Sequence, residues 1–522
     1  MPTLEWIGKD KVINHHQNVP YRVLEEKYTY NAEQSDNMII RGDNLEALKA
    51  LLPLYEGKIK CIYIDPPYNT GNENWVYNDN VNDPKIKKWL GEVVGKEGED
   101  LSRHDKWLCM MYPRLKLLQK LLSDDGYIFI SINFADECAY LRCICDEIFG
   151  KNNFIGELTW ESTTQPINSG SAKFNLQQKT EPILLFAKKK KEKYKFILQE
   201  TENNLSYPHN GKLGACRFEI IEKSDAGDYN RPTMKYEILG QLPREGKRWQ
   251  IGKDTALELL KNNRLEIVDG VVKKAVYPED EYDKRSFLPF WSHYSAAQVG
   301  AALNGKDILN TIMGEPIGFD TVKPPKLIEE FISHIANDAI ILDSFSGSGT
   351  TAHAVLNMNK TDGGNRKFIL VEMEDYAETI TAERVKRVID GYGEGKNAVD
   401  GTGGNFTFYD LGEPLLIDND QLNEKVDTQK IREYVWFMET KKPLCEVYTD
   451  DNEFFLGVNN DNAYYFYYEK EKITTLNNKF LATVKTKADT YIIYADKCTY
   501  SDEALRKYNI TFKKIPRDIS KL

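Results

Sequence analysis

The feature that most constrains this chain is the tetrapeptide Asp65-Pro66-Pro67-Tyr68, which directly follows an apolar run at residues 59–64. A short apolar run of this kind predicts a buried strand. In an open parallel sheet, ligands bind beyond the carboxyl ends of the strands. Proline has a fixed φ and no N–H donor, so we expect the Pro66 and Pro67 carbonyls to have few internal partners. The tetrapeptide therefore predicts a small acceptor-rich pocket with an aromatic ring on one wall.

Such a pocket suits a planar aromatic amine, whose exocyclic nitrogen is a poor nucleophile because its lone pair is delocalised into the ring. Two acceptors on the two N–H groups draw that nitrogen toward tetrahedral geometry, and fixed dipoles aimed at developing charge are a strong catalytic device. Asp65 and the Pro66 carbonyl are the candidate acceptors, and Tyr68 is placed to stack on the base. The competing interpretation is a strand that stops at a proline turn, with Tyr68 as ordinary packing.

A second motif follows the apolar run at residues 339–342 and reads Asp343-Ser344-Phe345-Ser346-Gly347-Ser348-Gly349-Thr350. Glycines allow close backbone approach to a ligand, and the N–H groups of the helix predicted next suit an anionic group. A further strand at residues 367–371 ends at Glu372, and an acid about twenty residues after a glycine-rich turn is a typical partner of ribose hydroxyls.

Two other interpretations of the glycine loop stay open. Gly347, Gly349 and Ala352 satisfy the dinucleotide fingerprint G-x-G-x-x-G/A, which keeps a nicotinamide-dependent oxidoreductase among the alternatives. A purely structural glycine turn is the other. No Gly-Lys-Ser/Thr follows the loop, so it is not a Walker A motif.

Taken together, the two motifs are more specific than either alone. The chain resembles the β-class amino-methyltransferases of DNA, in which an Asp-Pro-Pro-Tyr element precedes a Phe-x-Gly-x-Gly element. Residues 37–48 resemble the opening strand and helix of that family, and residues 319–325 resemble its motif X. Residues 363–370 and 509–518 are similar to the modification (Mod) subunits of type III restriction–modification systems.

The resemblance implies a role for each motif residue. Asp65, Pro66, Pro67 and Tyr68 would hold a flipped target base. The S-adenosylmethionine (AdoMet) site would be formed from Asp43, Lys323, Asp343, Phe345, Gly347, Gly349, Thr350 and Glu372. Within this set Glu372 would bind the ribose hydroxyls, and Asp43 and Lys323 would lie at the adenine end and rim. Asn133 stands where family members often carry an acid, which puts a cofactor contact there in doubt.

The implied activity is transfer of a methyl group from AdoMet to adenine N6 in double-stranded DNA, and Asp at position 65 favours adenine over cytosine. The implied partners are a restriction (helicase–nuclease) subunit and a second copy in a homodimer. A non-catalytic DNA- or partner-binding subunit and an N4-cytosine methyltransferase are the remaining alternatives.

Composition is compatible with this activity. With a net charge of −11, DNA contact requires a local basic face. The eight cysteines lack zinc-like spacing, so we expect free thiols in a reducing cytoplasm and no metal site. No apolar run is long enough to span a bilayer, so we expect no membrane contact.

The alternation of predicted strands and helices indicates an α/β fold with a doubly wound, mostly parallel sheet. Because the tetrapeptide precedes the glycine loop, this Rossmann-like methyltransferase fold would be circularly permuted. We expect an N-terminal extension (1–36), a catalytic half (37–191), a target-recognition region (192–290), a cofactor-binding half (291–410) and a small strand-rich C-terminal domain (411–522). The polar residues 69–105 predict a lid or DNA-contacting loop. Within the target-recognition region, the candidates for DNA contact are Arg231, Lys235, Arg244, Lys247, Arg248 and Trp249.

Overall fold

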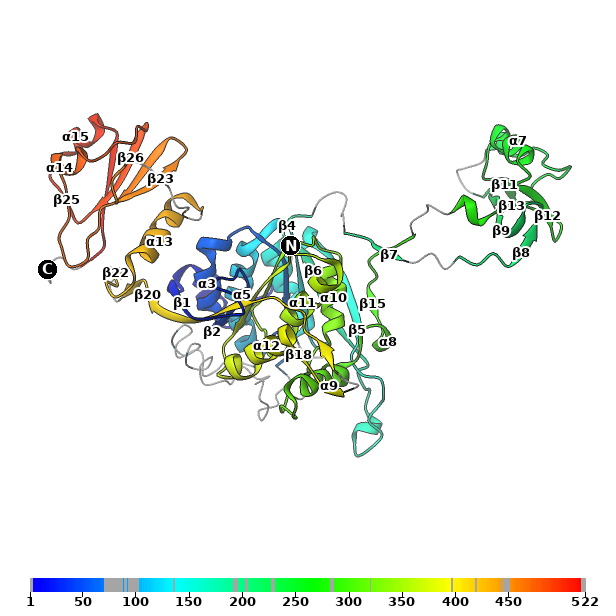
Figure 1. Ribbon diagram of the computed structural model, residues 1–522, viewed down its shortest axis with the longest axis horizontal. Coiled ribbons are helices and arrows are strands. Elements are labelled where there is room, and N and C mark those ends of the chain that lie inside the picture. Colours follow the sequence, from blue (N-terminus) through cyan, green and yellow to red (C-terminus); the bar gives the residue numbers. More distant parts are fainter. Residues whose placement is uncertain are drawn as a thin grey trace. The chain divides into compact units, whose positions relative to one another are not determined.

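The computed structural model describes residues 3–69, 88, 92, 103–134, 137–190, 196–201, 205–226, 231–281, 286–319, 321–395, 398–417, 420–442, 444 and 451–517. Most of the predicted lid, residues 70–102, therefore lies outside the described residues. By internal contacts the chain divides into two compact units, one of residues 1–197 and 291–522 and one of residues 198–290. The second unit is drawn in green in Figure 1.

A ten-stranded sheet forms the centre of the first unit, in the order β1-β20-β2-β17-β16-β3-β4-β6-β5-β15. The six strands from β20 to β4 run parallel, β1 and β6 run antiparallel to their neighbours, and β15 is parallel to β5. The bounds are β1 Arg22–Tyr30, β20 Phe406–Pro414, β2 Met38–Arg41, β17 Lys367–Glu372, β16 Ile340–Asp343, β3 Ile59–Ile64, β4 Leu122–Ser131, β6 Thr180–Ala187, β5 Phe154–Glu161 and β15 His293–Tyr294.

The two sequence halves meet in the middle of this sheet. Strand β16 pairs in parallel with β3, with Ile341 opposite Cys61 and Leu342 opposite Ile62. On its other side, β16 pairs with β17. The predicted strands of both motifs are therefore confirmed, and their carboxyl ends lie side by side at one edge of the sheet.

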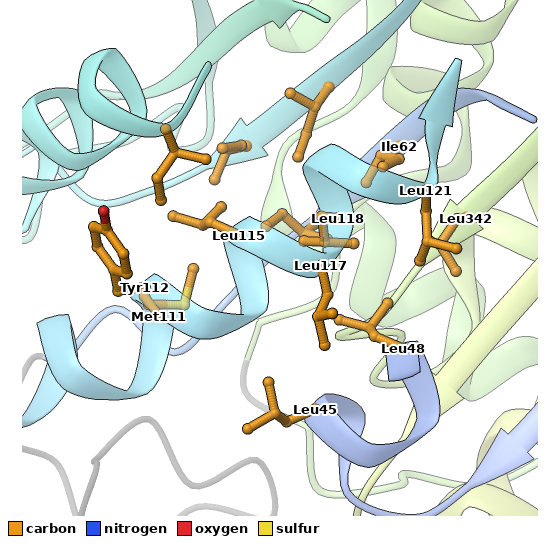
Figure 2. Close-up of a cluster of buried hydrophobic side chains, with 14 of the residues drawn as sticks. Leu45, Leu48, Ile62, Met111, Tyr112, Leu115, Leu117, Leu118, Leu121 and Leu342 are labelled. Atoms are coloured by element: carbon orange, nitrogen blue, oxygen red, sulfur yellow. The ribbon is translucent and has the colours of Figure 1, made fainter. Parts of the chain in front are cut away.

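Helices cover both faces of the sheet, as a doubly wound fold requires (Figure 1). Because successive strand residues point to opposite faces, Ile62 and Ile64 join the core beneath α3 (Asn44–Tyr55) and α5 (Arg103–Leu121). Figure 2 shows Leu115, Leu117, Leu118 and Leu121 of α5 gathered with Leu48, Ile62 and Leu342.

The opposite face of the sheet is covered by α10 (Pro325–Ser333). Phe331 of this helix stacks on Phe129 of β4 at a centroid distance of 4.9 Å and lies 6.1 Å from the ring of Tyr63 on β3. Helix α11 (Thr350–Asp362) packs against α10. The α/β, doubly wound, mostly parallel fold is therefore confirmed.

Two local predictions need correction. Apolar residues at helical spacing predict a helix from Arg103 through Leu122, with Asp124-Asp125-Gly126 as its stop. The helix ends at Leu121, and β4 begins directly at Leu122. Gly126 is a strand residue that packs against β3, because a Cβ there would lie 2.8 Å from the Ile59 carbonyl oxygen. The sequence also predicts a helix from Asp136 to Phe149, with Gly150 as its stop. The described part of this segment is α6 (Cys138–Cys145) followed by a π-helical turn (Asp146–Gly150).

The second unit contains a four-stranded sheet in the order β12-β13-β9-β8, with bounds Leu265–Val268, Val271–Val276, Gly214–Ile220 and His209–Gly211. Trp249 was expected at a DNA-contacting surface, but it is 1% exposed and packs in this unit's core. Arg244 pairs with Glu222 at 2.6 Å, and Lys235 pairs with Asp225. The expectation for Trp249 is therefore wrong, and these two cations are partly neutralised.

The C-terminal region carries its own sheet in the order β23-β24-β26-β28, with bounds Phe455–Asn459, Asn462–Phe466, Thr490–Ala495 and Ile510–Lys514. Tyr464, Tyr465 and Phe466 of β24 are buried in the core of this region. Because β1 and β20 belong to the central sheet, regular structure crosses the predicted boundaries at residues 36 and 411, and the division into domains stays a prediction. Within the described chain, no helix combines the length and the apolar character needed to cross a membrane.

Candidate functional site

The carboxyl ends of the parallel strands carry the polar groups of the site. Asp65 follows β3, Asp343 ends β16 and Glu372 ends β17. A cavity of about 230 Å³ opens at this edge. Its walls come from both motifs and from the segment before α10, and the polar and aromatic lining residues are Tyr63, Asp65, Tyr68, Asn133, Trp160, Glu181, Phe319, Thr321, Lys323, Asp343, Phe345, Ser346, Ser348, Thr350 and Thr351.

One wall of the cavity is a compact network around Lys323. Its Nζ donates to Asp65 Oδ2 at 2.7 Å and to Tyr68 Oη at 2.8 Å. Tyr68 Oη in turn lies 2.7 Å from Asp65 Oδ1 and 3.1 Å from Glu181 Oε2. The Asp-Pro-Pro-Tyr tetrapeptide is thus fixed by a cation and an acid from distant parts of the sequence.

The charge states in this network follow from its burial. Burial alone would lower the pKa of Lys323, but the carboxylates of Asp65 and Glu181 outweigh it and leave that pKa raised. Burial, and then the charges of Asp65 and Glu181, raise the pKa of Tyr68 well above its ordinary value. At neutral pH the network therefore holds a protonated lysine and a neutral phenol.

The two proline carbonyls differ in their surroundings. The Pro67 carbonyl accepts a hydrogen bond of 2.7 Å from Trp107 Nε1, which is within the few internal partners expected for it. Within the described chain, the Pro66 carbonyl has no hydrogen-bond donor, and Pro66 lines the cavity. Trp107 thus anchors the turn while the Pro66 acceptor remains available at the cavity.

The opposite wall is the glycine loop between β16 and α11. Gly347 and Gly349 have φ values of 50° and 81°, in the region that favours glycine. A Cβ at Gly349 would lie 3.2 Å from both Cγ2 and the carbonyl oxygen of Thr381, and Thr381 Oγ1 donates to the Gly347 carbonyl at 2.6 Å. The loop is therefore held from behind by Thr381, with its other side toward the cavity.

Two acids brace this loop. Asp343 accepts from Phe345 N at 3.1 Å and from Thr351 Oγ1 at 2.5 Å, whereas Glu372 accepts from Gly347 N at 2.8 Å. Burial raises the pKa of Asp343 to about 7, and burial also raises the pKa of Glu372 to about 7. Each acid is therefore partly protonated near neutral pH.

Most of the predicted site residues meet at this cavity, since Asp65, Pro66, Tyr68, Lys323, Asp343, Phe345, Gly347 and Thr350 all line it. Pro67, Gly349, Glu372 and Asp43 are not among the described lining residues. Asp43 caps α3, accepting from Leu45 N at 2.9 Å, and pairs with Arg114 at 3.2 Å. Lys323, expected at the cofactor rim, lies beside Asp65, and the roles inferred for these residues stay predictions.

Sequence reasoning missed Glu181 and Trp160. Glu181 lies near the start of β6, which runs antiparallel to β4, and Trp160 lies near the end of β5. Both positions therefore fall at the edge where the parallel strands end. The available signal was an acid just before the apolar run at residues 183–187, but its significance depends on the strand direction.

The chain is similar in sequence to several known DNA-modifying proteins. The sequence model described as "DNA methylase" matches residues 59–383. The type III restriction-modification enzyme EcoP15I Mod subunit of Escherichia coli is 30% identical over 438 residues, which cover 72% of this chain and 64% of that protein. The StyLTI Mod subunit of Salmonella typhimurium is 31% identical, covering 71% and 58%. The type II methyltransferase M.KpnI of Klebsiella pneumoniae is 30% identical, covering 68% and 85%.

Among solved structures, the PvuII DNA methyltransferase (cytosine-N4-specific) aligns with a TM-score of 0.32 and 16% identity over 67% of this chain and 87% of that one. The M1.HpyAVI-SAM complex aligns with a TM-score of 0.29 and 16% identity over 67% and 98%. The present chain spans about three fifths of the length of the type III Mod subunits that it matches, 64% of one and 58% of another.

Proposed function

Because this chain belongs to the DNA methylase family, we propose that it transfers a methyl group from AdoMet to adenine N6 in double-stranded DNA. The observation that carries this proposal is the cavity in which the Asp65–Tyr68 network faces the glycine loop. A methyl donor and an amine acceptor must be held in line within one site, and this arrangement provides a wall for each.

The glycine loop fits AdoMet in its chemistry. Ser346 Oγ is buried at the cavity and has no hydrogen-bond partner within the described chain, so it is free to bind a ligand. The first N–H groups of α11 and the hydroxyls of Ser348 and Thr350 add further donors. When bound there, AdoMet supplies an electrophilic methyl group on a sulfonium. Phe345, Gly347 and Asp343 would line its site, with Glu372 supporting the loop from the next strand.

The tetrapeptide supplies what the amine needs. Asp65 Oδ1 and the Pro66 carbonyl would each accept one N–H of the exocyclic amine, which localises the nitrogen lone pair. Ionised carboxylate oxygens have lone pairs to spare, so Asp65 can accept from the base while bound to Tyr68 and Lys323. The base must leave the duplex to reach this pocket. Lys323 would hold Asp65 in this orientation through its 2.7 Å contact with Oδ2.

The finer assignments rest on the resemblance of this chain to its relatives. Aspartate at position 65 favours adenine, and an N4-cytosine methyltransferase is the second candidate. The relatives named as Mod subunits support a role as the modification subunit of a restriction–modification system. A cytoplasmic location is part of the proposal. A restriction subunit as partner, a homodimeric state and target recognition by residues 192–290 are part of the same proposal.

The test incubates purified protein with isotopically labelled AdoMet and unmethylated genomic DNA, beside the Asp65→Ala variant, and identifies nucleosides by mass spectrometry. We expect labelled N6-methyladenine with the unaltered protein and at least 100-fold less with Asp65→Ala, because one of the two acceptors of the amine is lost. AdoMet affinity, measured by calorimetry, should be retained in the variant.

Other products would redirect the assignment. N4-methylcytosine would keep the cofactor and overturn the base. AdoMet binding without any methylated product would favour the non-catalytic subunit, and binding of a nicotinamide cofactor instead of AdoMet would favour the oxidoreductase. Normal turnover by Asp65→Ala would overturn the role of the tetrapeptide.

A further inference from the structure

A fully buried arginine lies behind the glycine loop. Arg384 belongs to α12 (Glu383–Asp390) and is 0% exposed. Its Nη1 donates to Ser348 Oγ and to Thr350 Oγ1, both at 2.8 Å, and also to the Ser348 carbonyl at 3.3 Å. The guanidinium therefore binds the loop at the two hydroxyl residues that flank Gly349.

No carboxylate of the described chain forms an ion pair with this arginine. Its Nη2 contacts His353 Nδ1 at 3.3 Å, and its Nε has no partner within the described residues. Burial lowers the pKa of Arg384 to about 9, so it stays charged at neutral pH, and burial lowers the pKa of His353 well below its ordinary value, so that ring is neutral. A buried charge without a counter-charge is costly.

The nearby acids are engaged elsewhere. Asp343 binds Thr351 and Phe345, and Glu372 binds Gly347 and Glu374 through backbone N–H groups. The buried arginine also lies near the amino end of α11, where the helix dipole adds further positive potential. Within the described chain the guanidinium of Arg384 therefore has no carboxylate partner, and a bound anion would supply one.

Two hydroxyl groups link the arginine to the cavity. Because Ser348 Oγ and Thr350 Oγ1 accept from the arginine, their own hydrogens remain available for donation, and both residues line the cavity. Ser346, 6% exposed, adds a buried hydroxyl without a partner in the described chain. Three hydroxyl donors backed by a buried cation match a carboxylate.

We propose that Arg384 is a positioning residue that orients Ser348 and Thr350 to bind the carboxylate of the methionyl group of AdoMet. This inference rests on the proposed function and deepens it. The bound carboxylate supplies the counter-charge that the protein itself lacks, so the arginine makes the site select for a cofactor that carries an α-carboxylate. In this arrangement Arg384 acts through the two hydroxyls and does not touch the cofactor.

The experiment compares two ligands that differ only in the carboxylate, AdoMet and decarboxylated AdoMet, by calorimetric titration of the full chain. The unaltered protein should prefer AdoMet. Arg384→Met keeps most of the side-chain length and removes the charge. We expect it to weaken AdoMet binding about tenfold or more, as for loss of a charge-assisted interaction, and to change binding of decarboxylated AdoMet less than threefold.

Arg366→Met is the matched control, because Arg366 is also buried but has its own acid, Asp362, at 2.8 Å. It should leave the preference between the two ligands unchanged. If Arg384→Met does not fold, the double variant Ser348→Ala/Thr350→Val answers the question with Arg384 in place, and it should show the same selective loss.

Equal weakening of both ligands by either folded variant would overturn the inference and leave the proposed function intact. Failure of the unaltered protein to bind AdoMet would overturn the proposed function, and the inference with it.

Discussion

At the scale of single residues, the site is defined by buried charges whose partners come from other parts of the chain. Lys323 joins Asp65 from 258 positions away, and Glu181 joins Tyr68 from 113 positions away. The lysine has its counter-charges, whereas Asp343 and Glu372 are buried acids that hydrogen bonds only partly compensate. Because Asp343 and Glu372 are buried, the unfolding free energy of the protein should depend on pH.

Asp343→Asn tests this dependence. The pKa of Asp343 is about 7 in the folded chain, against an ordinary value of 3.8, so the folded chain retains a proton that the unfolded chain releases between these values. Below about pH 4 the carboxyl is protonated in both states, and its burial does not lower the unfolding free energy through this ionisation. As pH rises from 4 to 7 the unfolding free energy falls, and above pH 7 the loss stays constant. Without ligand, the unaltered protein should lose more unfolding free energy than Asp343→Asn between pH 5 and 8, by a few kcal/mol in order of magnitude.

Chemical denaturation at a series of pH values measures this difference. Asp338→Asn is the matched control, because Asp338 is an exposed aspartate just before the same strand. Its stability curve should run parallel to that of the unaltered protein. Parallel curves for Asp343→Asn as well would show that the burial of Asp343 carries no such cost.

At the scale of elements, the amino end of α3 connects the sheet edge to the helical layer. Asp43 accepts from Leu45 N and Glu46 N, and its carboxylate pairs with Arg114 of α5, which is 1% exposed. One side chain thus begins one helix and fixes a second helix against it. This geometry accounts for Asp43 without a ligand, so its predicted cofactor contact needs a separate test.

Two substitutions separate the functions of Asp43. Asp43→Asn keeps an acceptor for the helix end but removes the charge facing Arg114, and we expect a loss of about 1 to 3 kcal/mol in unfolding free energy. Asp43→Ala removes the cap as well and should lose about 1 kcal/mol more. Urea denaturation gives the stabilities and calorimetry gives AdoMet affinity. A loss of AdoMet affinity in a fully stable Asp43→Asn variant would instead support cofactor contact.

At the scale of the whole molecule, the second unit is an insertion whose two ends pair with each other. Strand β7 (Gln199–Thr201) runs antiparallel to β14 (Ser286–Leu288), with Thr201 opposite Ser286. The chain therefore enters and leaves this unit through a two-stranded ribbon. Every residue that lines the described cavity belongs to the first unit. Removing the unit would therefore remove no described residue that lines the cavity.

Replacing residues 202–285 with a short Gly-Ser turn tests this separation, since two paired strand ends can be joined by a tight hairpin. We expect AdoMet affinity within about twofold of the unaltered protein, because no described cavity residue is removed. Methylation of DNA should be abolished if these residues recognise the target. Calorimetry and the nucleoside assay give the two results, and undiminished methylation would move target recognition elsewhere.

The amino-acid sequence alone predicts the local strands of the site and the motifs that follow them. The strands at residues 59–64, 340–343 and 367–372 follow from apolar runs ended by an acid, and glycine marks the loop before α11. Apolar runs and glycine turns are set by residues that are neighbours in the sequence, so they can be predicted without the tertiary structure. The resemblance to the β-class amino-methyltransferases, rather than any local preference, predicts that the tetrapeptide and the glycine loop are two parts of one site. The long helix α5 is also predictable, apart from its exact end at Leu121.

The distant residues that complete the site depend instead on tertiary structure. The direction of β6 brings Glu181 to the edge where the parallel strands end, and the segment before α10 brings in Lys323. Arg384 is recognisable only from its burial and from the absence of an acid partner in the described chain. Strand order, register and burial arise from many weak long-range contacts acting together, and no local run of sequence encodes them.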